Sequence, residues 1–233
     1  MCTAVSRTST SSGQQLAEPS DTPAQRTEAT ATLGGLAFDQ TTARTCNSLR
    51  ISTKPEFPNQ RFYNRTLTTG CNPDPIPNVG RFTIVECDGH EENIHGSRRN
   101  QREADKVGMC VNLLIGEYGV SPSEIGVAAA YSEQKKHLQH VISQLSLDGV
   151  HEVKVDSFDG FQGSERDVMV LSFTRSNEDN NIGFLAGSNG ARRLNVALTR
   201  AKRACYLVGD WNTLRQSPET DLYDDLYEYV NSL

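Results

Sequence analysis

Long apolar runs are absent from this 233-residue sequence. None approaches the ~20 residues that a membrane-spanning helix needs, and the N-terminus lacks the apolar core of a secretory signal. The six cysteines form no Cys-x-x-Cys pair and the histidines lack zinc-ligand spacing, so neither structural zinc nor a disulfide framework is expected. These absences predict an intracellular protein, cytoplasmic or nuclear, with reduced thiols. The Ser- and Thr-rich start also suits a transit peptide, although Arg7 and Arg26 alone supply early positive charge.

The motifs that hold the phosphates of a nucleotide are also missing. No stretch matches GxxxxGK[ST], whose backbone amides and lysine hold the phosphates of ATP. No acidic DExx strand end is present to hold Mg²⁺. A complete nucleotide hydrolase therefore cannot be assembled from these residues, and any use of a nucleotide requires a second domain that supplies both features.

Composition and charge divide the chain into four parts. Hydrophobic residues make up 36% of the sequence, and residues 1–45, rich in Ser, Thr, Ala, Gln and Gly, are predicted to be disordered because they cannot bury a core. Five prolines predict that residues 46–80 are an irregular linker. Residues 81–218 are the predicted folded domain, and residues 219–233, with five acids and no Lys or Arg, an acidic helix. Residues 46–218 hold 20 basic and 20 acidic side chains, so nucleic acid would need a local basic patch.

Strand and helix patterns alternate through the predicted folded domain. Short β-prone apolar runs predict strands, and apolar residues at helical spacing predict helices. Several strands are apolar throughout, which is typical of a parallel sheet covered on both faces by helices. Ser132 is expected to cap the helix that it precedes. The expected strands are residues 82–87, 125–130, 153–156, 167–173 and 204–208, and the expected helices are residues 102–118, 133–147, 194–201 and 222–230.

The loop DSFDGFQGSE, at residues 156–165, has the residue types of a ligand-binding turn. It follows an expected strand, and ligands of open α/β sheets bind at the carboxyl ends of strands. Gly160 and Gly163 let backbone amides approach a ligand closely. The side chains suited to a phosphate, a sugar hydroxyl or a water are Ser157, Gln162 and Glu165. An ordinary glycine-containing loop is the alternative.

A basic segment, RRLNVALTRAKR at residues 192–203, is expected to form a helix that faces the same cleft from another direction. At helical spacing Arg193 and Arg200 fall near one face. An arginine held near a nucleotide neutralises the negative charge that develops during phosphoryl transfer. The alternative is a solvated basic face on a helix that packs Leu194 and Leu198 inward, and the residues alone do not decide between the two.

Several stretches, in matching order, resemble the C-terminal motor domain of superfamily-1 helicases of the up-frameshift and senataxin kind. The resemblance covers about residues 57–215. Its motifs IV, V and VI are matched by IGVAAAYSEQ at 125–134, VDSFDGFQGSERDVMVLSFTRSN at 155–177 and RRLNVALTRAK at 192–202. IGFL at 182–185 matches the segment that leads into the last motif, and FPNQRFYNRTL at 57–67 and HGSRRNQREAD at 95–105 are similar to linking segments.

The resemblance implies a RecA-like α/β domain of the P-loop-NTPase type. Such a domain couples ATP to movement along single-stranded RNA or DNA when it is joined to a first RecA-like domain. Arg200 is implied to be the arginine finger that reaches the γ-phosphate. ATP and Mg²⁺ are implied to bind only with the first domain present, and no residue of this chain is implied to bind Mg²⁺. The residues implied to lie at the nucleotide are Gln162, Gly163 and Glu165. Gln134 and Tyr131 are implied to lie near the nucleotide or the nucleic-acid strand. The residues implied to contact nucleic acid are Asp156, Ser157, Arg175, Asn195 and Thr199.

The sequence departs from the family in one place. Before FPNQRFY the family usually has a Gln-Tyr-Arg-Met-His-Pro-like stretch whose arginine also reaches the γ-phosphate, whereas Arg50 lies here in no matching context. We therefore expect a helicase half that is inactive alone, as a truncated gene product or as one subunit of a split motor. The alternative is a non-catalytic RecA-like module that binds nucleic acid or a helicase partner, and a weaker one is a structural interaction domain on a disordered tether.

Overall fold

The computed structural model describes residues 56–66 and 73–233. The segment predicted to be disordered, residues 1–45, lies outside the described residues, and so do residues 46–55 and 67–72 of the predicted linker. In the described part, no helix is both long enough and apolar enough to cross a membrane.

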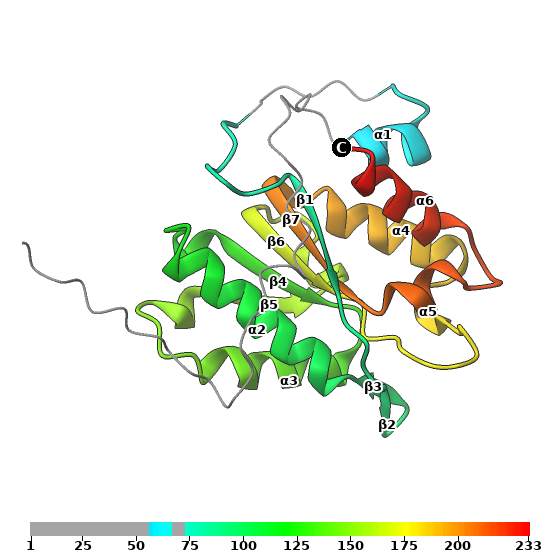
Figure 1. Cartoon of the computed structure of the whole chain (residues 1–233), viewed down its shortest axis with the longest axis horizontal. Coiled ribbons are helices and arrows are strands. Elements are labelled where there is room, and N and C mark those ends of the chain that lie inside the picture. Colours follow the sequence, from blue (N-terminus) through cyan, green and yellow to red (C-terminus); the bar gives the residue numbers. More distant parts are fainter. Residues whose placement is uncertain (1–55, 67–72) are drawn as a thin grey trace, which may run out of the picture. The chain divides into compact units, whose positions relative to one another are not determined.

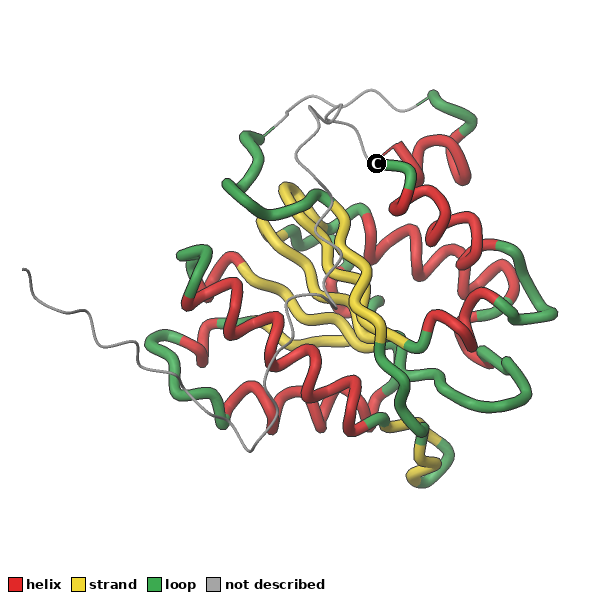
Figure 2. Tube along the Cα trace, viewed as in Figure 1, coloured by secondary structure: helices red, strands yellow, loops and turns green. Residues whose placement is uncertain are grey.

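A five-stranded sheet with parallel pairing throughout forms the centre of the described residues (Figure 2). Strand β4, which lies between β6 and β5, is buried along its whole length. Neighbouring residues of a strand point to opposite faces, so Val127 joins one hydrophobic cluster and Ala128 joins the other. The predicted α/β class with a mainly parallel sheet is confirmed. In order across the sheet, the strands are β1 Phe82–Glu86, β7 Ala201–Gly209, β6 Arg166–Ser172, β4 Ile125–Ala129 and β5 Lys154–Ser157.

Helices cover both faces of the sheet (Figure 1). Helices α2 and α3 lie on one face, where Val111, Leu114 and Leu138 are buried against the strands. The other face carries the remaining helices and the cluster that contains Leu194 and Trp211. The helices are α1 Glu56–Tyr63, α2 Gln101–Gly116, α3 Ser132–Ser143, α4 Gly187–Leu198, α5 Trp211–Arg215 and α6 Leu222–Asn231. An antiparallel hairpin of β2 Glu92–Ile94 and β3 Ser97–Arg99 precedes α2, and short 3-10 turns span Pro122–Glu124, Val150–Glu152, Asp159–Phe161 and Gly183–Leu185.

Helix α1 lies within the segment that was predicted to be irregular, and it corrects that prediction. Pro58 occupies the third position of the helix. A helix tolerates proline in its first turn because the N–H groups there have no intrahelical partner. Phe57 is buried and packs against Tyr229 of α6, with ring centroids 5.5 Å apart. Tertiary packing therefore stabilises a helix that the proline content argued against.

Helix α4 begins and ends earlier in the chain than predicted. Thr199 closes it, because the Thr199 hydroxyl donates to the carbonyl oxygens of Asn195, at 2.9 Å, and Val196, at 3.0 Å. Arg200 consequently lies beyond the helix and directly before β7. It does not share a helical face with Arg193, which corrects the prediction from spacing.

Three shorter features also differ from expectation. Ser132 is the first residue of α3 rather than its cap, and Tyr131 takes the capping position without a side-chain bond to the helix. The β2–β3 hairpin and α5 were not predicted.

Helix α5 is too short to show a periodicity, and it begins where the Asp210 carboxylate accepts the Thr213 N–H at 3.1 Å. Helix α6 agrees with the predicted helix, and its buried face joins the cluster that also covers β1.

Candidate functional site

A cleft of about 970 Å³ opens at the carboxyl ends of β4, β5 and β6. Tyr131 follows β4, Ser157 ends β5, and Arg175 follows β6, so the parallel sheet brings these three predicted site residues together. The β2–β3 hairpin and the loop before α4 supply the other walls. This edge is where ligands of open parallel sheets bind.

Arg175 is held at the cleft by an ion pair that is buried. Its Nε lies 2.7 Å from Oε2 of Glu91, and the two side chains are 6% and 8% exposed. Arg175 also donates from Nη1 to the Tyr131 hydroxyl, at 3.2 Å, and from Nη2 to Oδ1 of Asn181, at 3.3 Å. Burial opposes the charge, but the hydrogen bonds that Arg175 donates to Glu91 and Tyr131 outweigh it and raise the pKa of Arg175. The guanidinium is therefore a fixed positive charge in the cleft wall.

Gly183 lets the loop before α4 approach that guanidinium. Its φ is +50°, and a Cβ at this position would lie 2.2 Å from Nη1 of Arg175. Only glycine meets both conditions, since it lacks a Cβ and tolerates positive φ. The next residue, Phe184, donates its N–H to the Tyr131 hydroxyl at 3.2 Å. The close approach thus fixes Phe184 at the rim of the cleft.

Lys135 brings a second positive charge into the cleft from the first turn of α3. Its Nζ lies 3.6 Å from Oδ1 of Asp156, and both side chains are about one-third exposed. The same Asp156 oxygen accepts the Ser157 N–H at 2.8 Å. Asp156, a predicted nucleic-acid contact, therefore orients Lys135 and the strand end. Ser157 itself lines the cleft.

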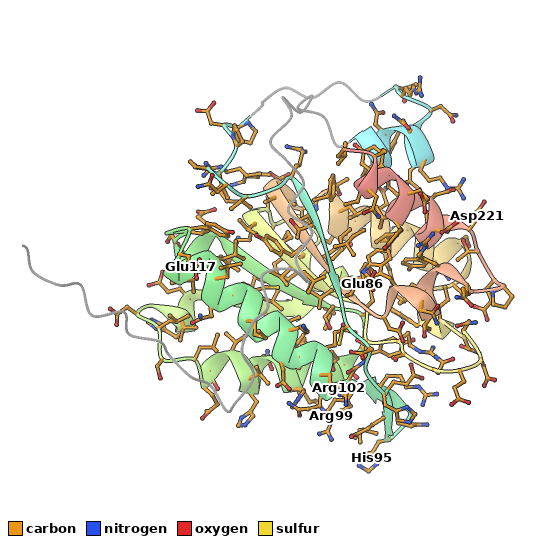
Figure 3. The ribbon with its side chains drawn as sticks, viewed as in Figure 1. Glu86, His95, Arg99, Arg102, Glu117 and Asp221 are labelled. Atoms are coloured by element: carbon orange, nitrogen blue, oxygen red, sulfur yellow. The ribbon has the colours of Figure 1, made fainter. Side chains whose placement is uncertain are left out.

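The β2–β3 hairpin forms a wall of the cleft that the sequence reasoning missed. Ser97 joins the hairpin to α3, since its Oγ lies 3.0 Å from Oγ of Ser132 and accepts the Glu133 N–H at 3.2 Å. Arg98 faces the cleft, with its Nε 3.6 Å from Oε1 of Glu91. Figure 3 shows His95 at the tip of the hairpin. The sequence feature that could have indicated this wall is HGSRRNQREAD at residues 95–105, where basic residues follow a glycine that suits a turn.

Gln134 lies behind the cleft rather than in it. The side chain is fully buried. Its Nε2 donates to the Asn100 carbonyl, at 3.1 Å, and to Oγ of Ser172, at 3.2 Å, while its Oε1 accepts the Asn100 N–H at 2.8 Å. Gln134 thus joins the start of α2 to the end of β6, and its contact with a nucleotide or a nucleic-acid strand stays a prediction.

A buried carboxylate completes this polar cluster. Glu103 has no exposed surface, and its carboxylate accepts the Ser172 hydroxyl at 2.5 Å and the Thr174 N–H at 2.8 and 2.9 Å. Thr174 adopts a φ of +74°, which is uncommon for a β-branched residue. The next residue, Arg175, lines the cleft. Burial raises the pKa of Glu103 to about 8, against the bonds from Ser172 and Thr174.

The other predicted nucleotide residues lie at the opposite edge of the sheet. Glu165 directly precedes β6 and Arg200 directly precedes β7, so both stand where parallel strands begin. The Arg166 N–H donates to the Arg200 carbonyl at 3.0 Å and joins the two segments. Gln162 and Gly163 lie in the same connection, which crosses from the end of β5 to the start of β6 with only one short 3-10 turn. The expectation that residues 192–203 face the carboxyl-end cleft is therefore corrected for Arg200.

The Arg200 side chain folds back on the end of α4. Its Nε donates to the Val196 carbonyl at 3.2 Å, and its Nη2 donates to Oγ1 of Thr199 at 3.2 Å. Thr199 and Asn195, predicted to contact nucleic acid, therefore lie with Arg200 and away from the residues of the cleft. Asn195 donates from Nδ2 to the Tyr63 hydroxyl of α1 at 2.8 Å. The predicted nucleic-acid residues thus fall into two groups at opposite edges.

The His, Cys, Asp and Glu side chains of the described residues form no metal site, and the cysteines among them are buried. No group of three or more His, Cys, Asp or Glu side chains there is arranged to hold a metal ion. Cys87, Cys110 and Cys205 are buried and form no disulfide. Burial raises the pKa of Cys87 and of Cys110 to about 12, so these thiols stay protonated at neutral pH.

The sequence matches known proteins across this same region. The family described as "AAA domain" matches residues 50–212. The chain is 38% identical over 178 residues to a protein of Arabidopsis thaliana named regulator of nonsense transcripts 1 homolog, and 35% identical over 193 residues to regulator of nonsense transcripts 1 of Caenorhabditis elegans. These matches cover 70% and 76% of this chain, but only 14% and 17% of the relatives.

A helicase of an archaeon gives a match of similar extent. The chain is 32% identical over 198 residues to an uncharacterized ATP-dependent helicase of Methanocaldococcus jannaschii, which covers 76% of this chain and 27% of that protein. All three matched regions are therefore parts of longer proteins.

Proposed function

We propose a motor function for this chain, which belongs to the AAA domain family and is a superfamily-1 helicase C-terminal RecA-like domain. It acts as one half of a nucleic-acid-dependent ATPase. A first RecA-like domain, in cis or in trans, supplies the P-loop and the Mg²⁺ site, neither of which is present among these residues. The motor works on single-stranded RNA or DNA, inside the cytoplasm or the nucleus.

The separation of the predicted site residues onto two edges of one sheet carries this proposal. Arg200 and Glu165 stand at the starting edge, while Ser157 and Arg175 stand at the carboxyl edge. The loop from residue 156 to residue 165 reaches both edges. A change at a nucleotide on one edge can therefore reach a nucleic-acid strand on the other through a packed sheet, which transmits strain well.

Nucleotide chemistry is assigned to the starting edge. Arg200 stabilises the charge that develops on the transferred phosphoryl group, and Glu165, with Gln162 and Gly163, lies beside the ribose. ATP and Mg²⁺ are held between this edge and the first domain. The nucleic-acid backbone is assigned to the carboxyl edge, where Arg175 and Lys135 offer positive charge.

The purified chain alone is expected not to hydrolyse ATP, since no P-loop lysine or acidic Mg²⁺ ligand motif is present. The measurement is phosphate release with and without single-stranded nucleic acid. Turnover that nucleic acid stimulates, and that Arg200→Ala abolishes, would contradict this expectation. The absent P-loop also favours the second candidate, a non-catalytic module. That candidate predicts nucleic-acid binding without ATP turnover even after a compatible first domain is supplied.

Lys135→Ala is expected to weaken binding of single-stranded nucleic acid and to remove one phosphate contact. The slope of log K against log salt concentration should fall in magnitude by about 0.7, the value for one contact on a single strand. Lys136→Ala is the matched control, because Lys136 is more exposed and pairs with Glu133 but does not line the cleft. If Lys135→Ala and Lys136→Ala give equal slopes, the bound nucleic acid does not contact Lys135 in the cleft.

A further inference from the structure

Phe184 is an exposed aromatic residue whose position is fixed by three contacts. It is 41% exposed, and Tyr63 at 37% is the other large hydrophobic side chain that the described residues leave exposed. The Phe184 N–H is bonded to the Tyr131 hydroxyl, and the two rings lie 5.7 Å apart between centroids. The Arg193 guanidinium carbon lies 3.7 Å from the centroid of the Phe184 ring. The ring is thus held in place at the cleft rather than left as a loose surface group.

Arg193 is oriented for this contact by a partner on a different element. Its Nε donates to Oδ2 of Asp159 at 3.2 Å, and Asp159 opens the 3-10 turn after β5. The side chain of Arg193 is one-quarter exposed. A guanidinium carbon this close to the ring centroid covers one face of the ring, because arginine stacks on aromatic faces, while the ring as a whole stays 41% exposed. Phe184 and Arg193 together form a flat, partly exposed platform, with Tyr131 beside it.

Positive charge lies next to this platform. Arg175 donates to the same Tyr131 hydroxyl that receives the Phe184 N–H, and Lys135 lines the same cleft. A flat aromatic surface beside fixed cations matches the chemistry of one nucleotide of a single strand. The base stacks on the ring, and the phosphate meets the cations.

We infer that Phe184, with Arg193, is a stacking platform for one base of a single-stranded nucleic acid bound in the carboxyl-end cleft. The inference rests on the proposed nucleic-acid function. That function requires contacts with the phosphates alone, and the inference adds a contact with a base. Stacking uses the π-face that every base has, so the platform binds without sequence preference. The exocyclic groups of the base do not decide binding there.

The test compares Phe184→Ala and Phe184→Trp in the full chain, with Tyr63→Ala as the matched control. Affinity is measured for an oligodeoxythymidine strand and for an abasic strand of equal length, over a range of salt concentrations. Phe184→Ala should weaken thymidine binding by about 10-fold or more, as the loss of one stacked base entails. Phe184→Trp and Tyr63→Ala should keep the affinity of the unmodified chain. The salt slope should not change, because no phosphate contact is lost.

The abasic strand separates stacking from a structural role. All variants should bind it equally, since it offers no base to the platform. An equal loss on both strands would assign Phe184 to the shape of the cleft and overturn the inference. Equal thymidine affinity of Phe184→Ala and the unmodified chain would also overturn it, while the proposed function stands. If the unmodified chain binds neither strand, the nucleic-acid function falls together with the platform.

Discussion

Arg200→Ala is expected to lower kcat for ATP by ~10³-fold or more, in a protein that joins this chain to a compatible first RecA-like domain. An arginine at the nucleotide neutralises charge that appears only in the transition state, so kcat falls and not only affinity. The structure supports this role because Arg200 stands at the starting edge of the sheet, away from the cleft that holds Arg175 and Lys135. Its guanidinium is held by Val196 and Thr199, which orient it at the end of α4.

Two further variants separate charge from geometry at this position. Arg200→Lys should restore little of the rate, because lysine keeps the charge but loses the planar fork of donors. Arg192→Ala is the control, since Arg192 is an exposed arginine of α4, the helix that ends just before Arg200. It should keep normal turnover. Arg200→Ala itself should change the free energy of unfolding by less than about 1 kcal/mol, since it removes only hydrogen bonds at a partly exposed helix end.

The contrary result is equally specific. If Arg200→Ala keeps normal kcat, but the salt slope of nucleic-acid binding falls by about 0.7 in magnitude, then Arg200 contacts the strand backbone. The nucleotide assignment of the starting edge would then be wrong. The assignment of the carboxyl edge would stand, because it depends on other residues.

The sheet was predictable from the sequence because its central strands carry a signal that few other structures share. Runs such as Ile125–Ala129 and residues 168–171 are apolar on both alternating sets of residues, which requires burial on both faces and therefore helices on both. The amphipathic spacing of α2 and α3 predicted the helices of one face, and that of α6 predicted a helix of the other. Helix α1 was not predictable, because its proline is tolerated only by its place in the first turn and its packing partner lies in α6.

The division of the site residues between two edges could not be predicted, because it depends on how a connection crosses the sheet. Residues 156–165 follow a strand, and sequence spacing alone places all of them at its carboxyl end. In the structure only the first of them stay there, and Glu165 reaches the start of β6. Arg193 and Arg200 separate for a similar reason, since α4 ends between them. Glu91, the buried partner of Arg175, lies 84 residues away in sequence, and no local pattern connects the two.

The free energy of unfolding is expected to fall as pH rises from about 5 to about 8, because of Glu103. Burial raises the pKa of this carboxyl from its ordinary 4.5 to about 8 in the folded protein. Between these values the folded protein keeps a proton that the unfolded chain releases, so each unit of pH favours unfolding. Above about pH 8 the effect is complete. At 1.36 kcal/mol per pKa unit, the loss is at most about 5 kcal/mol.

Glu103→Gln is the variant that tests this assignment, because glutamine keeps the shape and does not titrate. Its own free energy of unfolding should be lower near pH 5, since its amide cannot accept the Thr174 N–H with both atoms, as the two oxygens of Glu103 do. The difference between the two proteins should then shrink or reverse toward pH 8, where the native protein carries a buried charge.

Urea unfolding of both proteins across pH 5 to pH 8.5 gives this difference directly, and each free energy is obtained at its own pH. Glu117→Gln is the control, because Glu117 is an exposed carboxylate at the other end of α2 and should leave the pH profile unchanged. A constant difference between native protein and Glu103→Gln would mean that Glu103 is ionised throughout. In that case the hydrogen bonds from Ser172 and Thr174 stabilise the Glu103 anion by more than its burial destabilises it. Thr174 would then be bound by an ionised carboxylate and not by a neutral acid.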